Sequence, residues 1–187
     1  MKRRLLSLCM ALALCLGLLP ATALAAAPPE NQVLYVGGVL ISSPGYWTTS
    51  EDGKTLTSVT SVTESNNYIH YDADNKTLTL HNATIKEALD YGDDPPNSLI
   101  FGAAIGVLNQ NGAAELTITL EGTNTIAEVG KGIYVLASST STGGATLTIT
   151  GGGSLDASAS QTGIWVQSNS NNAALCVKNA EIGRAHV

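Results

Sequence analysis

"LTITGGGSL", residues 147–155, alternates apolar and polar residues and then passes through three consecutive glycines. Alternation with a period of two is typical of a strand that buries one face, and the glycines predict a turn after it. Similar units are "LTLHNATI" at 78–85, "ITLEGTNTI" at 118–126 and "LCVKNA" at 175–180. The chain therefore repeats a strand unit at a spacing of roughly thirty residues.

A second unit alternates with the first along the chain. It reads "AIGVLNQ" at 104–110, "GIYVLAS" at 132–138 and "GIWVQSN" at 163–169. Repeated strands of this kind bury their apolar faces by stacking on one another. We predict an all-β fold, a right-handed parallel β-helix of about three to four coils. The alternative is a β-sandwich, which also shows alternation and turns but does not require near-constant spacing.

The repeat predicts which side chains face the core. One inward row contains Leu78, Ile118, Leu147 and Leu175, and a second contains Leu80, Leu120, Ile149 and Val177. An outward row contains Thr79, Thr119, Thr148 and Cys176.

The ends of the chain differ from the repeats. Residues 1–25 have a basic start, an apolar run and a small-x-small site at Ala23 to Ala25, which predicts a secretory signal peptide. Residues 33–70 are predicted to form an N-terminal strand and loop cap, and 71–180 the β-helix repeats, in truncated form. Residues 181–187, "EIGRAHV", resemble read-through of a sequencing adapter, so we assign them no function.

Composition limits the partners. Residues 26–180 contain five lysines, no arginine and fourteen carboxylates. A surface this acidic argues against nucleic acid, whose phosphates require lysine and arginine. We expect a secreted or extracellular protein, with cell-wall association as one option. The apolar run near the start is too short to favour a membrane span, and we expect none in the mature chain.

The order of "LYVGG", "YW", "YDADNKTLTLHNATI", "LTITLEGTNTI…GIYV" and "LTITGGGSL…GIWV" resembles a family of secreted bacterial proteins. These proteins, mostly from Gram-positive anaerobes, are described as carbohydrate-binding domain-containing. The resemblance covers nearly all of 33–180. It implies a β-helical, secreted or cell-surface protein that binds a polysaccharide or a cell-surface glycan.

Aromatic residues supply the first candidate site. Gly106, Tyr134 and Trp165 occupy one position in three successive copies of the second unit. Each lies between inward-pointing residues, so Tyr134 and Trp165 are expected to lie side by side on an outer face. Exposed rings can bind the C–H-rich face of a sugar, and Gln167 can supply a hydrogen bond. Alternatively, a flanking loop covers the aromatic residues.

Tyr46 and Trp47 form a second aromatic pair, next to Pro44 and Gly45. We consider them as carbohydrate-binding residues too, with the alternative that they close the end of a core. In "YDADNK", residues 71–76, the acidic residues predict a tight turn between two strands, since no calcium-loop pattern is complete. We therefore expect no metal and no cofactor.

The sequence favours a protein without catalytic activity. It contains no G-x-S-x-G and no H-E-x-x-H motif, residues 26–180 have no arginine, and the repeated strands carry few outward carboxylates, of which Glu121 is the clear one. Polysaccharide-degrading β-helical enzymes need a cationic base or paired acids. The leading hypothesis is a glycan-binding module. The alternatives are a structural or adhesive surface stalk and a fragment of a polysaccharide-degrading enzyme.

Overall fold

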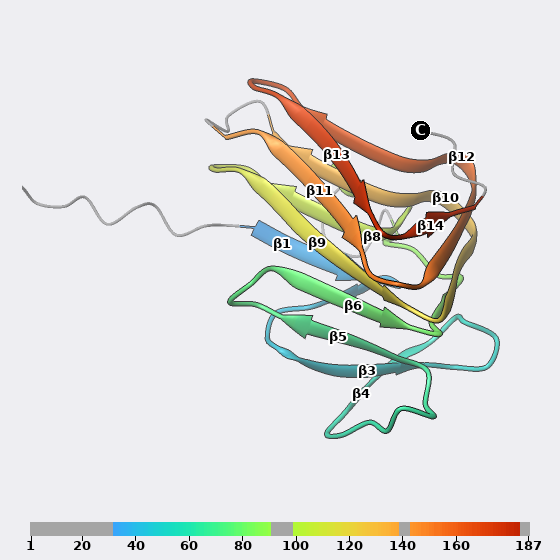
Figure 1. Cartoon of the computed structure of the whole chain (residues 1–187). Coiled ribbons are helices and arrows are strands. Elements are labelled where there is room, and N and C mark those ends of the chain that lie inside the picture. Colours follow the sequence, from blue (N-terminus) through green and yellow to red (C-terminus); the bar gives the residue numbers. More distant parts are fainter. Residues whose placement is uncertain (1–31, 91–98, 139–142, 184–187) are drawn as a thin grey trace, which may run out of the picture.

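The computed structural model describes residues 32–90, 99–138 and 143–183 (Figure 1). These residues form fourteen β-strands and no α-helix, which confirms the all-β class. In these same ranges no helix is long and apolar enough to span a membrane. The predicted signal peptide at 1–25 lies outside the described residues.

The strands form two mixed sheets of seven strands each. Sheet A has the order β14-β12-β10-β8-β1-β2, with β7 beside β10, and sheet B has the order β13-β11-β9-β6-β5-β3-β4. Sheet A contains β1 (Gln32–Val36), β2 (Val39–Leu40), β7 (Thr84–Ile85), β8 (Ala103–Asn109), β10 (Thr123–Ala137), β12 (Ser154–Ser168) and β14 (Glu181–Ile182). Sheet B contains β3 (Gly45–Thr49), β4 (Leu56–Val59), β5 (Tyr68–Asp72), β6 (Thr77–His81), β9 (Ala114–Glu121), β11 (Ala145–Thr150) and β13 (Ala173–Lys178).

From β8 onwards the chain alternates between the two sheets, and Figure 1 shows the successive strands stacked in order. The pairs β8/β10 and β10/β12 in sheet A are parallel, as are β6/β9, β9/β11 and β11/β13 in sheet B. The N-terminal segment is antiparallel instead: β1 pairs with β8, and β3 pairs with β4 and β5. Each sheet is therefore parallel in its later part and antiparallel where the N-terminal segment joins it.

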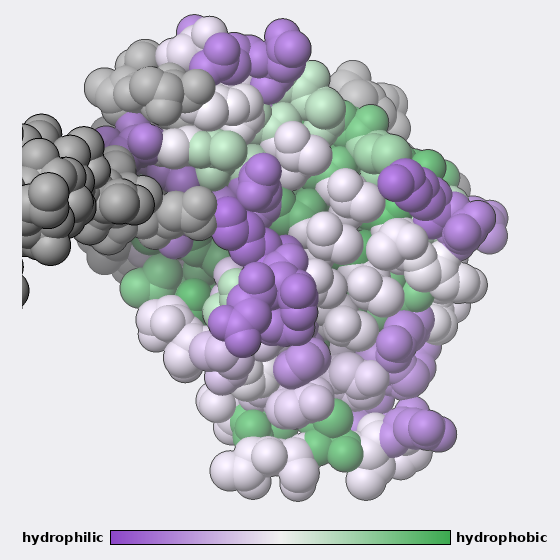
Figure 2. Space-filling model, turned by 60° about the vertical axis from the view of Figure 1, so that its left-hand side comes forward, coloured by the Kyte–Doolittle hydropathy of each residue, from purple (hydrophilic) through white to green (hydrophobic). Residues whose placement is uncertain are grey.

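The core lies between the inner faces of the sheets. Leu78, Ile118, Leu147 and Ile149 are fully buried there, as the alternating pattern predicts. Figure 2 shows a surface on which pale, near-neutral and purple, hydrophilic residues predominate, with small green apolar areas. Apolar burial, at about 25 cal/mol per Å² of surface removed from water, is the main stabilising contribution in a fold of this kind.

One alignment predicted from the sequence is wrong by two residues. Leu147 pairs with Leu116 and Ile149 with Ile118, whereas we expected Ile149 beside Leu120. In this register Gly151, rather than Ile149, lies beside Leu120 of the neighbouring strand. A shift of two residues keeps each side chain on its predicted face, because successive strand residues alternate between faces.

The other rows are partly confirmed. Leu78 pairs with Ile118 and Leu80 with Leu120, and β13 adds Leu175 and Val177 beside Leu147 and Ile149. In the outward rows Thr79 pairs with Thr119, but Thr148 and Cys176 continue a row that begins at Thr77 and Thr117. The last inward residue, Val177, is 44% exposed.

Within the segment that resembles adapter read-through, Glu181 and Ile182 form the short strand β14. It pairs in parallel with Ser154 and Leu155 at the start of β12.

Candidate functional site

The predicted aromatic row is present on the outer face of sheet A. In the parallel register Tyr134 of β10 lies between Gly106 of β8 and Trp165 of β12. The neighbouring residues Ile133 and Ile164 are buried in the core, at 0% and 2% exposure. Strand alternation therefore directs the side chains of Tyr134 and Trp165 away from the core.

The two rings stack on one another. Their centroids are 4.9 Å apart and their planes are inclined by 21°. Tyr134 is 5% exposed, whereas Trp165 is 41% exposed. Trp165 thus presents an accessible ring that is supported by a buried one.

Two described residues between β7 and β8 contribute to the burial of Tyr134. Leu89 and Ile100 belong to a small apolar cluster with Tyr134 on this side of sheet A. Ile100 occupies the space that Gly106 leaves, since a Cβ at Gly106 would lie 3.0 Å from the Ile100 Cδ1 atom. The alternative of a covering segment is therefore confirmed for Tyr134, while Trp165 remains exposed.

Polar contacts fix the surroundings of the rings. The Tyr134 hydroxyl donates to Oε1 of Gln167 at 2.9 Å, and Nε2 of Gln167 donates to Oδ1 of Asn169 at 2.7 Å. The ammonium group of Lys131 lies 5.6 Å from the centre of the Tyr134 ring and donates to the Phe101 carbonyl oxygen at 2.6 Å. Burial raises the pKa of Tyr134 and lowers the pKa of Lys131.

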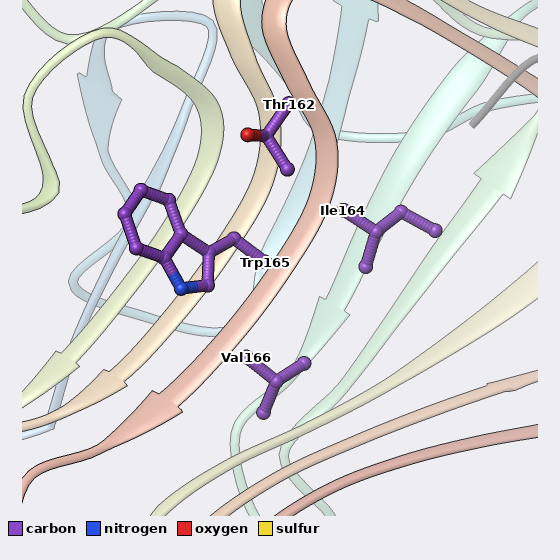
Figure 3. Close-up of a pocket in the computed structure, with 4 residues that line it drawn as sticks. All are labelled: Thr162, Ile164, Trp165 and Val166. Carbon is purple, nitrogen blue, oxygen red and sulfur yellow. The ribbon is translucent and has the colours of Figure 1, made fainter. Parts of the chain in front are cut away.

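A hollow of about 300 Å³ lies along this part of β12. It is lined by Thr162, Ile164, Trp165 and Val166. Figure 3 shows Trp165 on one side of the strand and Ile164 and Val166 on the other. The hollow therefore reaches both sides of β12, with the exposed indole on one side and two aliphatic side chains on the other.

The second predicted aromatic pair does not join this site. Tyr46 and Trp47 lie on β3 of sheet B and point to opposite faces of it. Trp47 is 8% exposed and belongs to the main core cluster, so its ring does not present a binding surface. This placement fits the alternative in which the residue closes a core.

Tyr46 is half-buried on the outer face of sheet B and joins aromatic residues that sequence reasoning missed. Its ring stacks on His70 with centroids 4.2 Å apart, and Tyr68 stacks on His81 at 4.7 Å. The signal was present in "YIHYD", residues 68–72, whose alternation places Tyr68 and His70 on one face. The antiparallel pairing that brings Tyr46 and His81 beside them was not visible in the repeat.

The acidic segment 71–76 forms the predicted tight turn between β5 and β6. Oδ1 of Asp72 accepts hydrogen bonds from the backbone N–H groups of Asp74 and Asn75, at 3.1 and 3.3 Å. The pKa of Asp72 is lowered, first by the hydrogen bond that the Asn75 side chain donates to Oδ2 at 2.7 Å and then by these backbone contacts. Within the described ranges, no group of three or more His, Cys, Asp or Glu residues is arranged to hold a metal ion.

Comparison with known proteins adds no relative: no family model, no curated protein and no solved structure matches the chain.

Proposed function

We propose that this chain is a secreted, non-catalytic module that binds a polysaccharide or cell-surface glycan through the exposed ring of Trp165. The observation that carries the proposal is the indole of Trp165, 41% exposed on a strand whose neighbouring residue Ile164 is buried. A large aromatic ring held outside the core is available to a ligand. Stacking on the apolar face of a pyranose ring uses such a surface.

The surroundings of Trp165 support the same function. The indole stacks on the ring of Tyr134 and is already ordered by this contact. Ligand binding therefore does not have to carry the entropic cost of ordering the indole. Gln167 is held by Tyr134 and Asn169 close to the ring, where its amide can orient sugar hydroxyls. A rigid apolar platform with an adjacent polar group is a suitable arrangement for recognising a sugar.

For the fold we propose a parallel β-helix for the part from β6 onwards. The support is the alternation of strands between the sheets together with parallel, in-register pairing of β8, β10 and β12. In such a stack one residue of each coil lies above the equivalent residue of the next. The row Gly106, Tyr134 and Trp165 follows this rule.

The test is binding of the purified chain to soluble polysaccharides by affinity gel electrophoresis and calorimetry. The panel contains hydroxyethyl cellulose, a β-1,3-glucan, a galactomannan and polygalacturonate. For a polysaccharide that binds, Trp165→Ala is expected to weaken affinity about tenfold, equivalent to about 1.4 kcal/mol. Gln167→Ala is expected to weaken it about threefold through loss of an orienting hydrogen bond.

Leu40→Ala is the matched control, because Leu40 is also an exposed apolar residue, at 46%, but lies on β2. It should bind as the unaltered chain does. Equal affinity of the Trp165→Ala variant and the unaltered chain would contradict the proposed site. Release of reducing-end or unsaturated products from any of the polysaccharides would contradict a non-catalytic role.

A further inference from the structure

The outer face of sheet B carries a second group of aromatic and hydroxyl side chains, distinct from Trp165. They project from five adjacent strands and alternate with buried core residues such as Leu78 and Ile118. The group contains Tyr46 on β3, Tyr68 and His70 on β5, Thr77, Thr79 and His81 on β6, Thr117, Thr119 and Glu121 on β9, and Thr146, Thr148 and Thr150 on β11.

The aromatic end of this face is formed by two stacked pairs. Tyr46 on His70 has ring planes inclined by 19°, and Tyr68 on His81 by 4°. The rings of Tyr46 and Tyr68 meet edge to face with centroids 6.1 Å apart. The four rings therefore form one continuous surface.

Hydrogen bonds fix this aromatic surface. Oε2 of Glu121 accepts from the Tyr68 hydroxyl at 3.0 Å and lies 3.0 Å from Nδ1 of His81. Nε2 of His81 lies 3.0 Å from the carbonyl oxygen of Glu64. Both partners of His81 are acceptors, so each ring nitrogen bonds its partner when it carries the hydrogen. The rings are thus positioned before any ligand arrives.

Two rows of threonine cross the strands, and the first of them continues from the aromatic end. In the first row Tyr46 pairs with His70, which pairs with Thr79, and Thr119 and Thr150 follow. The second row contains Thr77, Thr117 and Thr148. Because adjacent strands lie about 4.8 Å apart, each row offers hydroxyl groups at nearly the length of one pyranose unit in a linear chain.

A polar hollow of about 230 Å³ lies beside the second row. Lys76 and Glu115 form an ion pair at its edge, with Nζ and Oε2 3.2 Å apart. The hollow is lined by Asn75, Lys76, Glu115, Leu116, Thr117, Thr146 and Thr148. Amide, hydroxyl and charged groups that converge on one concave surface can bond the hydroxyls of a sugar.

The charges on this face favour an uncharged ligand. Each of its carboxylates already has a partner within the chain: Glu115 bonds Lys76, Glu121 bonds Tyr68, and Asp72 bonds Asn75. A polyanion would meet these carboxylates, and an apolar partner would leave the threonine hydroxyls without hydrogen bonds. Rows of hydroxyl groups, one of which ends in aromatic rings, suit a neutral polyol.

We infer that the outer face of sheet B binds an uncharged linear polysaccharide whose chain lies across the strands. One pyranose ring stacks on Tyr46, and the following units bond the row of Thr79, Thr119 and Thr150. This surface shares its ligand class with the proposed function but uses none of the residues around Trp165. The full chain then has two glycan-binding surfaces, one on each sheet.

The test measures affinity for hydroxyethyl cellulose, β-1,3-glucan and galactomannan in the Trp165→Ala background, where the remaining binding reports on sheet B. Tyr46→Ala is expected to weaken this binding about tenfold and Thr119→Val about threefold, by loss of stacking and of one hydrogen bond. Thr119→Val keeps the side-chain shape, so it remains informative even if Tyr46→Ala fails to fold. Thr125→Val on β10 of sheet A is the matched control and should leave the binding unchanged.

The outcomes separate the two proposals. If Thr119→Val and Tyr46→Ala bind within twofold of the Trp165→Ala background, or if Trp165→Ala alone removes all binding, the sheet B surface is overturned. The Trp165 site stands in either case only where Trp165→Ala weakens the binding of the unaltered chain. If Trp165→Ala has no effect while Tyr46→Ala weakens binding, the Trp165 site is overturned and sheet B is supported. If the unaltered chain binds none of the neutral polysaccharides, the sheet B surface is overturned, and if it does not bind polygalacturonate either, the Trp165 site is overturned too.

Discussion

The indole of Trp165 stacks on the phenol ring of Tyr134 with centroids 4.9 Å apart, yet only the indole is exposed. Both residues occupy equivalent positions on adjacent parallel strands. Tyr134 lies between β8 and β12 and shares an apolar cluster with Leu89 and Ile100, whereas β14 pairs only with the start of β12 and not beside Trp165. One residue of the pair therefore belongs to the packing of the fold, and the other is available to a ligand.

The two tryptophans of the chain are expected to differ in fluorescence. Trp47 is 8% exposed and Trp165 is 41% exposed. The Trp165→Phe variant, which retains only Trp47, should emit at shorter wavelength and resist quenching by acrylamide. The Trp47→Phe variant should emit at longer wavelength and be quenched readily. Similar emission maxima from the two variants would contradict the assigned burial.

The Tyr134 hydroxyl should contribute modestly to stability. Tyr134→Phe removes the hydrogen bond to Gln167 and is expected to lower the free energy of unfolding by about 1 kcal/mol. Tyr134→Ala also removes a buried ring and is expected to cost about 3 to 5 kcal/mol. Urea denaturation of both variants measures the difference, and a loss in Tyr134→Ala no larger than in Tyr134→Phe would argue against burial of the ring.

The glycines of the turn after β11 should differ sharply in tolerance. Gly151 has φ of +105°, and a Cβ there would overlap the backbone carbonyl of Leu120. Gly151→Ala is therefore expected to destabilise the fold by roughly 2 kcal/mol or more. Gly152, where an added Cβ meets nothing within 4 Å, is the matched control. Thermal unfolding that ranks Gly152→Ala as the more damaging change would refute the turn geometry.

Acid should weaken the turn between β5 and β6. The pKa of Asp72 is lowered from its ordinary value of 3.8, mainly by the hydrogen bond from the Asn75 side chain. The stabilisation is therefore complete above pH 3.8 and is lost as the pH falls through the lower pKa of the folded state. Asp72→Asn should remove this part of the fall in melting temperature between pH 5 and pH 2.

Asn75→Ala, which removes the side-chain hydrogen bond to Asp72, should reduce the acid dependence as well. If Asp72→Asn kept the acid dependence of the unaltered chain, the ionised Asp72 would not be stabilising the turn.

The alternation of apolar and polar residues was sufficient to predict whether most strand side chains point toward the core or away from it. Alternation with a period of two placed Leu78, Leu80 and Ile149 inward and Thr79 outward. It also placed Tyr134 beside Trp165, because two copies of one unit align in a parallel stack. The register at β11 was not determined in this way, since Gly151 stands where the preceding coil has Leu120.

Of the two candidate sites, the sequence predicted the one at Trp165 and not the aromatic group on sheet B. The position of Trp165 outside the core follows from the repeat, but the assembly of Tyr46, Tyr68, His70 and His81 depends on antiparallel pairings of β3, β5 and β6. No periodic pattern marks those pairings, because they join the segment that does not repeat.

The sequence by itself determined the strand period and hence the face on which each side chain lies. The tertiary structure decided which outward residues are covered: Tyr134 by Leu89 and Ile100, and Trp165 by neither. The physical reason is that the face of a strand residue is set by its immediate neighbours in the chain. Its exposure is set by segments that are distant in the sequence and reach it only through packing.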